Sequence, residues 1–301
     1  MATETEEQLA WEARQRPRAG VAAILAALLG LAGPMWRVIG LSDAPQAGFL
    51  ESLGHAAGSG PIGRAESVRI ATYQFYEDHA LTLIGSGLLT GLGLLALAWL
   101  VTFLAVAVRA RRPEFIRLAV YITSVGAVLY AISAVLGPIG SVLAISDFLD
   151  GPRTVDDARD VGGSTLLVLA SLLGQIGPLA VVAGLFLVSL NAMRVGLLTR
   201  FLGILGMISG GLTVFSSFFL FAPFIQAFWL LSLGFVFLGV GRDGAPPAWR
   251  TGQAEPWPSQ REIAAQKQAA RQPAPEAVEA QPVPAGRPHP SSKKRKRKRR
   301  D

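Results

Sequence analysis

The chain has 301 residues, of which 51% are hydrophobic and only 16% are charged, and its formal net charge is +7. Soluble domains carry about 25% charged residues, so this composition excludes an ordinary soluble domain. Cysteine is absent, which excludes disulfides, thiolate metal sites and a cysteine nucleophile. The charges gather between long apolar stretches, and this pattern predicts an all-α membrane protein.

Five charge-free stretches carry this prediction. A helix needs roughly 20 apolar residues to cross a hydrocarbon core of about 30 Å. The first four stretches each suit one crossing, whereas the fifth, residues 201–241, is long enough for two and is interrupted at Ala222-Pro223. We therefore predict a polytopic bundle of six transmembrane helices. Their predicted ranges are 20–37, 80–108, 118–146, 164–191, 201–221 and 224–240.

The distribution of basic residues predicts the orientation. With six crossings, both termini lie on one side, and that side receives 23 of the 28 Lys and Arg residues. The positive-inside rule therefore places both termini in the cytoplasm. Residues 1–19 are then a cytoplasmic segment before the transmembrane domain, 20–241, and the first span is a retained signal anchor. The Arg-, Ala-, Gly- and Pro-rich composition is typical of a GC-rich bacterial genome, so we expect a bacterial cell membrane.

The first outer loop contains a predicted helix at Ala65–His79, leading into the second span. This helix either lies at the membrane interface or packs on the mouth of the bundle. Acidic and histidine side chains at Glu51, His55 and 77–79 could ligate a divalent cation, but their spacing is not diagnostic. We interpret them as solvated loop charges, and we expect neither a metal nor a cofactor.

Few polar residues fall within the predicted spans. They include Tyr121, Tyr130, Ser133, Ser141, Gln175 and Asn191. Gln175 is followed by Gly177-Pro178, where the proline removes a backbone donor and frees a carbonyl. Gln175, Gly177 and Pro178 are therefore a candidate cavity lining, although we favour structural hydrogen bonding between helices.

Two glycine-proline breaks suggest an alternative function. Gly33-Pro34 and Gly177-Pro178 interrupt the first and fourth spans, and interrupted helices at corresponding positions of two repeats mark transporter sites. The alternative is thus a small-molecule permease with a midplane site at these breaks. The G-x-x-x-G pairs at Gly87/Gly91 and Gly206/Gly210 indicate close helix packing, within the bundle or in an oligomer.

Motifs of membrane or soluble enzymes are absent. The spans contain no histidine, and the H-E-x-x-H, Walker and G-x-S-x-G patterns do not occur. We expect no catalytic residue, and we predict a non-enzymatic protein with a structural or partner-binding role.

From residue 242 the chain becomes rich in Pro, Ala, Gln, Glu and Arg, which predicts a disordered cytoplasmic tail over 242–301. The tail ends in eight consecutive cations: Lys293, Lys294, Arg295, Lys296, Arg297, Lys298, Arg299 and Arg300. Each cation gains about 1 kcal/mol beside an anionic leaflet, so anionic lipid headgroups are the expected partner. Nucleic acid, for example on the ribosome, is the alternative, and we favour it less because the tail is tethered at the membrane.

The segment Asn191–Gly211, NAMRVGLLTRFLGILGMISGG, carries a resemblance. It is similar to the G-[FL]-L-[PT]-R-x-L-G-x-L segment of a family of bacterial six-span membrane proteins of unknown function. The matching residues are Gly196, Leu197, Leu198, Thr199, Arg200, Leu202, Gly203 and Leu205. The resemblance implies the fold and the membrane location, and it implies no activity. From the residues alone, Leu197–Arg200 is predicted to be a short cytoplasmic turn, with Arg200 anchoring the fifth span.

Overall fold

The computed structural model describes residues 2–46, 66–115, 117–214, 221–240, 246–257 and 262. The chain divides into two units, Met1–Trp257 and Pro258–Asp301, and the fold concerns the first of them. The predicted lipid-binding cations, Lys293–Arg300, lie outside the described residues.

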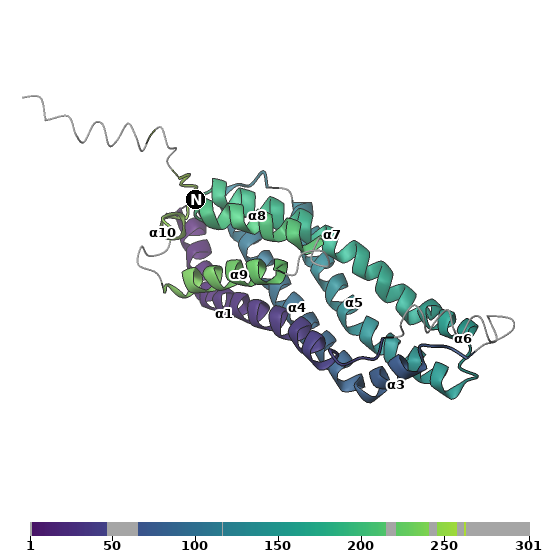
Figure 1. Ribbon diagram of the computed structural model, residues 1–301. Coiled ribbons are helices and arrows are strands. Elements are labelled where there is room, and N and C mark those ends of the chain that lie inside the picture. The colour runs from purple at the N-terminus through teal and green to yellow at the C-terminus, as the bar shows by residue number, and fades with distance from the viewer. Residues whose placement is uncertain are drawn as a thin grey trace, which may run out of the picture. The chain divides into compact units, whose positions relative to one another are not determined.

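Four long helices form most of the first unit (Figure 1). These are α1 (Ala2–Gly40), α4 (Ala80–Arg111), α5 (Arg117–Asp150) and α7 (Thr165–Arg194), and all four are long and apolar enough to cross a membrane. The predicted all-α bundle is thus confirmed. Within a few residues, α4, α5 and α7 match their predicted spans. The first helix is longer than predicted, because it runs unbroken from Ala2 through Pro17 and Pro34.

Two shorter apolar helices follow, α8 (Arg200–Val214) and α9 (Ala222–Leu238). They have 15 and 17 residues, which gives lengths of about 22 and 25 Å. The described chain therefore contains four helices of full crossing length and two shorter ones. The remaining elements are short: α3 (Ile70–Asp78), α6 (Val155–Asp160), η2 (Val161–Gly163) and α10 (Ala248–Thr251).

The six apolar helices form a closed ring in which α1, α4, α5, α7, α8 and α9 each pack on the next, and α9 returns to α1. Glycine makes these contacts close. A Cβ atom on Gly87 of α4 would clash with the backbone carbonyl of Ala134 on α5, and one on Gly177 of α7 would lie 2.8 Å from the backbone nitrogen of Tyr130. In a bilayer, lipid would provide no hydrophobic force between helices, and close van der Waals packing of this kind would hold them together.

Buried side chains gather towards the two ends of the helix bundle. The larger core surrounds the C-terminal half of α4, and it includes Leu100, Leu104, Leu185, Leu233 and Phe237. We call this end, where α4 finishes, the Arg111 end. The smaller core contains Tyr73, Ile145, Phe148, Leu149 and Ala158, and we call that end the α3 end.

Helix α3 packs on the mouth of the bundle, the second of its two predicted positions. The Tyr73 ring meets the Phe148 ring edge-on with centroids 5.1 Å apart. Helix α6 completes this core and begins with a capping box, in which the Thr154 hydroxyl donates to Asp157 at 2.7 Å. Hydrogen bonds from the Thr154 side chain and backbone lower the pKa of Asp157 below its ordinary value.

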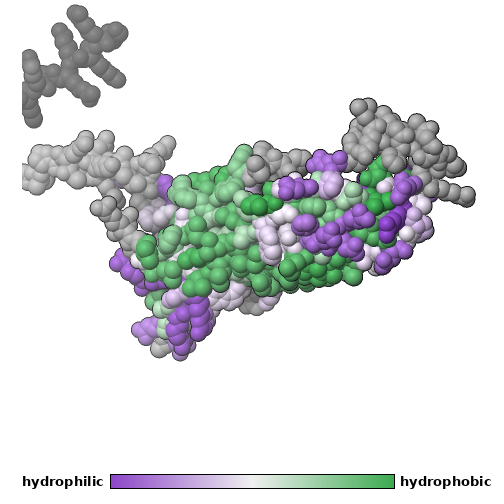
Figure 2. Space-filling view, turned by 60° about the horizontal axis from the view of Figure 1, so that its bottom comes forward, coloured by the Kyte–Doolittle hydropathy of each residue, from purple (hydrophilic) through white to green (hydrophobic). Residues whose placement is uncertain are grey.

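The outer face of the ring is apolar. Leu28, Leu92, Val125 and Leu172 are among the exposed hydrophobic side chains on the four long helices. Figure 2 shows hydrophobic surface across the middle of the described unit and hydrophilic surface towards its two ends. Monomeric soluble proteins rarely expose apolar patches beyond a few hundred Å², so this surface suits contact with lipid.

Candidate functional site

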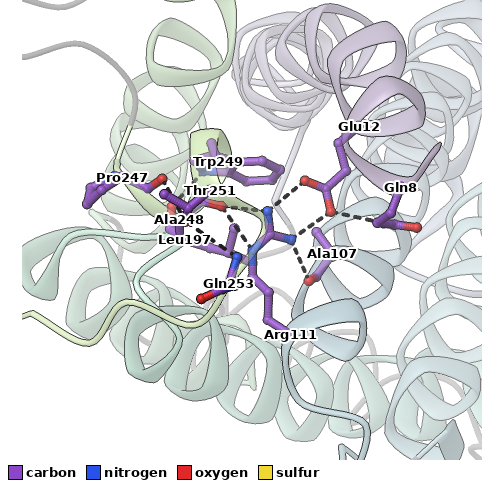
Figure 3. A network of polar contacts seen from close by, with 10 residues as sticks. All are labelled: Gln8, Glu12, Ala107, Arg111, Leu197, Pro247, Ala248, Trp249, Thr251 and Gln253. Atoms are coloured by element: carbon purple, nitrogen blue, oxygen red, sulfur yellow. Dashed lines mark hydrogen bonds and ion pairs between the residues drawn. The ribbon is translucent and has the colours of Figure 1, made fainter. Parts of the chain in front are cut away.

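Arg111, in the last turn of α4, forms a buried ion pair with Glu12 of α1 at the Arg111 end (Figure 3). Its Nη1 and Nη2 atoms donate to the two carboxylate oxygens of Glu12 at 2.6 and 2.8 Å. The exposed fractions of the two side chains are 0% and 2%. Bidentate pairing of a guanidinium with a carboxylate is among the strongest polar contacts in proteins, because both hydrogen bonds are charge-assisted.

The remaining donors of Arg111 are also satisfied. Nε and Nη2 donate to the carbonyl oxygen of Ala248 at 3.2 and 2.7 Å, and Nη1 donates to that of Ala107 at 3.0 Å. The guanidinium also lies 5.4 Å from the ring centroid of Trp249, within cation–π range. One side chain thus joins α1, α4 and α10. From the sequence alone, Arg111 is only one of the basic residues that predict the orientation.

The turn between α7 and α8 binds the segment 246–257. Trp249 Nε1 donates to the carbonyl of Leu197 at 2.9 Å, and Trp257 Nε1 donates to that of Leu198 at 2.7 Å. Arg200 Nη2 donates to the carbonyl of Trp257 at 3.0 Å. The predicted turn at Leu197–Arg200 is confirmed, and α8 begins at Arg200.

Gly196 makes this contact possible. Its φ angle is +78°, which places it in the left-handed region that glycine adopts without steric strain. A Cβ atom here would also clash with the carbonyl of Glu255, whose backbone nitrogen donates to the Val195 carbonyl at 3.1 Å. Position 196 therefore requires glycine for two separate reasons.

The prediction that the whole of 242–301 is disordered is wrong for residues 246–257. This segment contains α10, and its Ala248 and Trp249 are buried. The prediction rested on the low apolar content of the tail as a whole. It overlooked two tryptophans, Trp249 and Trp257, each of which donates its indole N–H to a backbone carbonyl. Interleaved tryptophan in a proline-rich tail was the signal that could have identified the docked segment.

A second feature is a cleft between α1, α4 and α5, which we call the cleft throughout. It consists of a wide hollow of about 540 Å³ and a narrow one of about 120 Å³. The two hollows share Pro34, Thr90 and Tyr130. The wide hollow reaches Arg37 and Ser141, whereas the narrow one extends to Gln226 and the apolar residues of α9.

The structure separates the residues predicted to line a cavity. Pro34 of the first break lines the cleft, whereas Gln175 borders a separate, more open hollow of about 390 Å³ that shares Ser133 and Gly137 with the cleft. Gly177 and Pro178 border neither hollow. The Gln175 side chain is exposed, and its amide nitrogen lies 3.4 Å from the Ser171 carbonyl. Gly177 is buried against Tyr130. Among the other polar candidates, Tyr130, Ser133 and Ser141 line the cleft, while the Asn191 side chain accepts a hydrogen bond from Arg112 at 3.0 Å.

No group of three or more His, Asp or Glu side chains within the described residues could hold a metal ion. His79, from the predicted candidate set, has its Nδ1 atom 2.8 Å from the Phe75 carbonyl. Glu51 and His55 lie outside the described residues.

The fold and these sites define an α-helical bundle protein with several candidate membrane helices. The chain belongs to the family defined by a domain of unknown function, DUF4386, whose family model matches residues 64–240. This finding confirms the resemblance to a family of unknown function. No curated protein and no solved structure matches the chain. Glu12 and Trp249 lie outside the matched region, yet both contact Arg111 within it.

Removing one partner of the buried ion pair leaves an uncompensated buried charge. We expect E12Q and R111M each to lower the free energy of unfolding by about 3–5 kcal/mol. The double variant should lose less than the sum of the two, because it leaves no unpaired charge. Chemical unfolding in detergent measures all three.

The exposed Arg159–Asp156 pair, whose side chains are 73% and 63% exposed, supplies the control. We expect D156N to change stability by less than about 1 kcal/mol. Additive effects of E12Q and R111M would contradict the coupling between Glu12 and Arg111.

The docking of 246–257 on Gly196 gives a second prediction. Since the chain lacks cysteine, a single A248C substitution reports on a position that is 0% exposed. We expect G196A to accelerate thiol labelling at this position about tenfold or more, the factor that corresponds to 1.4 kcal/mol, because the added Cβ displaces Glu255.

G239A is the matched control for G196A. Gly239 has a φ angle of +75°, but a Cβ atom there would meet nothing within 4 Å among the described residues. It carries the same backbone strain of about 1–2 kcal/mol and should leave the labelling rate unchanged. Equal labelling rates in the two variants would rule out the clash as the cause.

Proposed function

We propose that this protein is a non-enzymatic, six-pass protein of a bacterial cell membrane, which binds a partner at its cytoplasmic face. The docked segment 246–257 carries this proposal. Because Trp249 and Trp257 bind the α7–α8 turn, the tail after Trp257 starts at a fixed place on the Arg111 end. A basic tail with a fixed origin suits recruitment of a partner at that surface.

The ring arrangement supports six crossings. Six successive helices that pack on one another and close on the first fit six crossings of alternating direction. Helices α8 and α9 are about 22 and 25 Å long, which approaches one hydrocarbon thickness of about 30 Å. The Arg111 end then faces the cytoplasm, since it holds Arg109, Arg111, Arg112, Arg194 and Arg200.

The basic run favours anionic lipid headgroups as the partner. Eight adjacent cations at 293–300 would each gain about 1 kcal/mol near an anionic leaflet. A tail that starts at the membrane surface meets this leaflet before it meets any soluble polyanion. Nucleic acid, including the ribosome, is the less favoured partner, and an oligomer of the chain is compatible with either.

Non-enzymatic action is part of the same proposal. At the Arg111 end, Glu12, Arg111, Asn191 and Trp249 all form hydrogen bonds that hold helices or the docked segment together. These side chains act as structural links between elements.

A small-molecule permease is the second candidate, and the cleft is the observation that favours it. Its site would lie at the Gly33-Pro34 break predicted from the sequence, and it would also include Tyr130 and Arg37. The Gln175 side borders a neighbouring hollow that shares Ser133 and Gly137 with the cleft, so the two breaks line adjoining spaces and not one common site.

Thiol labelling tests the orientation. Ser42 and Gln253 are exposed, and we expect S42C, near the α3 end, to react with a membrane-impermeant maleimide on intact bacterial cells. Q253C should react only after the membrane is permeabilised. Labelling of Q253C on intact cells would overturn the cytoplasmic placement of the Arg111 end.

Vesicle capture tests the partner. The full chain is placed in nanodiscs of zwitterionic lipid and mixed with phosphatidylglycerol vesicles at low salt. We expect deletion of 293–300 to weaken capture at least tenfold, because about 1 kcal/mol per cation is lost. Replacement of the neighbouring 282–289 with Gly and Ser is the control and should leave capture intact. Undiminished capture by the deletion variant, or capture insensitive to salt, would discard the lipid role.

A further inference from the structure

The cleft has the size and shape of a ligand site. Its wide hollow of about 540 Å³ falls within the range of roughly 300–1,000 Å³ that is typical of small-molecule pockets. Its lining on α1 runs from Ala26 to Arg37, which is about 16 Å at 1.5 Å per residue. The space therefore suits one extended chain.

The cleft has an apolar end and a cationic end. The narrow hollow is lined by Ala26, Leu94, Leu97, Leu212 and Leu230. At the other end Arg37, three residues before the end of α1, borders the wide hollow. Its guanidinium has no hydrogen bond or ion pair with any described residue. A cation at the edge of the hydrocarbon region is stabilised by a counter-charge.

Between the two ends, the hydrogen-bonding groups of the lining fall into two kinds. The hydroxyls of Ser86, Thr90 and Ser133 donate to backbone carbonyls at 2.7–2.9 Å. By contrast, the Tyr130 hydroxyl and the Gln226 amide form no hydrogen bond with the described part of the chain. Both side chains are partly buried and line the cleft, so their polar groups are available to hydrogen-bond a polar group on the occupant.

The entrance determines how an occupant arrives. The wide hollow is bounded by α1, α4 and α5, and α1 and α5 each pack on α4. The described tips of α8 and α9, at Thr213 and Ala222, border only the narrow hollow. The described lining of the wide hollow thus belongs to three helices whose outer faces are apolar, which favours entry from the bilayer.

We propose that the cleft binds a single-chain, carboxylate-bearing amphiphile with a hydroxyl or carbonyl group midway along its chain. The carboxylate pairs with Arg37, the midway group bonds to Tyr130 and Gln226, and the end of the chain lies among Leu94, Leu97 and Leu230. This binding requires neither transport nor the partner-binding function of the tail.

Three probes separate the parts of this proposal: a mid-chain hydroxystearate, stearate, and the methyl ester of the hydroxystearate. Binding of each to the full chain in zwitterionic nanodiscs is measured by scintillation proximity with radiolabelled hydroxystearate and by competition. We expect hydroxystearate to bind more tightly than stearate by about fivefold, the value of one hydrogen bond. Its methyl ester should bind more weakly by tenfold or more, because charge-assisted pairing is lost.

Variants assign each preference to a residue. Y130F should remove the advantage of hydroxystearate over stearate while leaving stearate unchanged. R37Q should remove the advantage of the acid over the ester. A Cβ atom on Gly30 meets nothing within 4 Å and Gly30 lines the narrow hollow, so G30L should fill the cleft and block all three probes.

G211L is the matched control for G30L. Gly211 lies in α8, has open space at its Cβ position among the described residues and does not line the cleft, so all three affinities should persist. Thermal unfolding and gel filtration of each variant identify any that fail to fold. Absence of saturable binding, equal affinity of acid and ester, or unchanged binding in G30L would each overturn the proposal. Displacement of the probe by phosphatidic acid but not by stearate would assign the cleft to ordinary bilayer lipid instead. Vesicle capture by the tail is read separately and should be the same in all of these variants.

Discussion

A guanidinium with no exposed surface must find every hydrogen-bond acceptor inside the protein, and Arg111 does so. Its five N–H groups all donate, to Glu12, Ala107 and Ala248. Desolvating two charges costs several kcal/mol per ion, and only good geometry offsets this cost. The ion pair therefore constrains how the helices assemble more than it adds to the stability of the fold. Wherever Glu12 and Ala248 are not held in place, Arg111 cannot stay buried, so the start of α1, the end of α4 and α10 must assemble together.

The same end of the ring explains why a glycine-leucine-leucine turn matters to this fold. The carbonyls of Leu197 and Leu198 accept the two indole N–H groups of the docked segment, and Gly196 leaves room for its backbone. The turn lies inside the region shared with the family, whereas the segment that it binds lies beyond residue 240. Glu12, which lies before residue 64, contacts Arg111 at the same end. Glu12 and the segment 246–257, which both lie outside the family region, thus meet at the Arg111 end of the shared bundle.

Sequence patterns predicted what depends on local hydrophobicity. Charge-free runs predicted α4, α5 and α7 within a few residues, and the glycine pairs predicted close packing, which Gly87 shows against Ala134. Contacts between distant residues were not predictable in this way. Glu12 and Arg111 are 99 positions apart, and nothing in either local pattern indicates the other. Gln175 was selected because it is a polar residue close to the proline break at Gly177-Pro178. However, which side of α7 faces a neighbour depends on helix rotation, and this nearly uniform apolar helix carries little signal for its rotation. Tyr130 and Pro34 were chosen by equally local criteria, and they line the cleft because α5 and α1 happen to turn those faces towards α4.

The persistence of the cleft follows from how membrane helices are held together. In water, apolar walls that border a hollow would be driven together, but lipid exerts no such force between helices. Instead, contacts of small residues fix α1 and α5, the two walls of the cleft, separately to α4. Gly33 of α1 lies against Thr90 of α4, and Gly87 of α4 lies against Ala134 and Pro138 of α5. With both walls fixed on opposite sides of α4, the space between them is set by the width of that helix and its side chains. Closing the cleft would require α1 or α5 to leave these glycine contacts, so the hollow is preformed and an occupant need not open it.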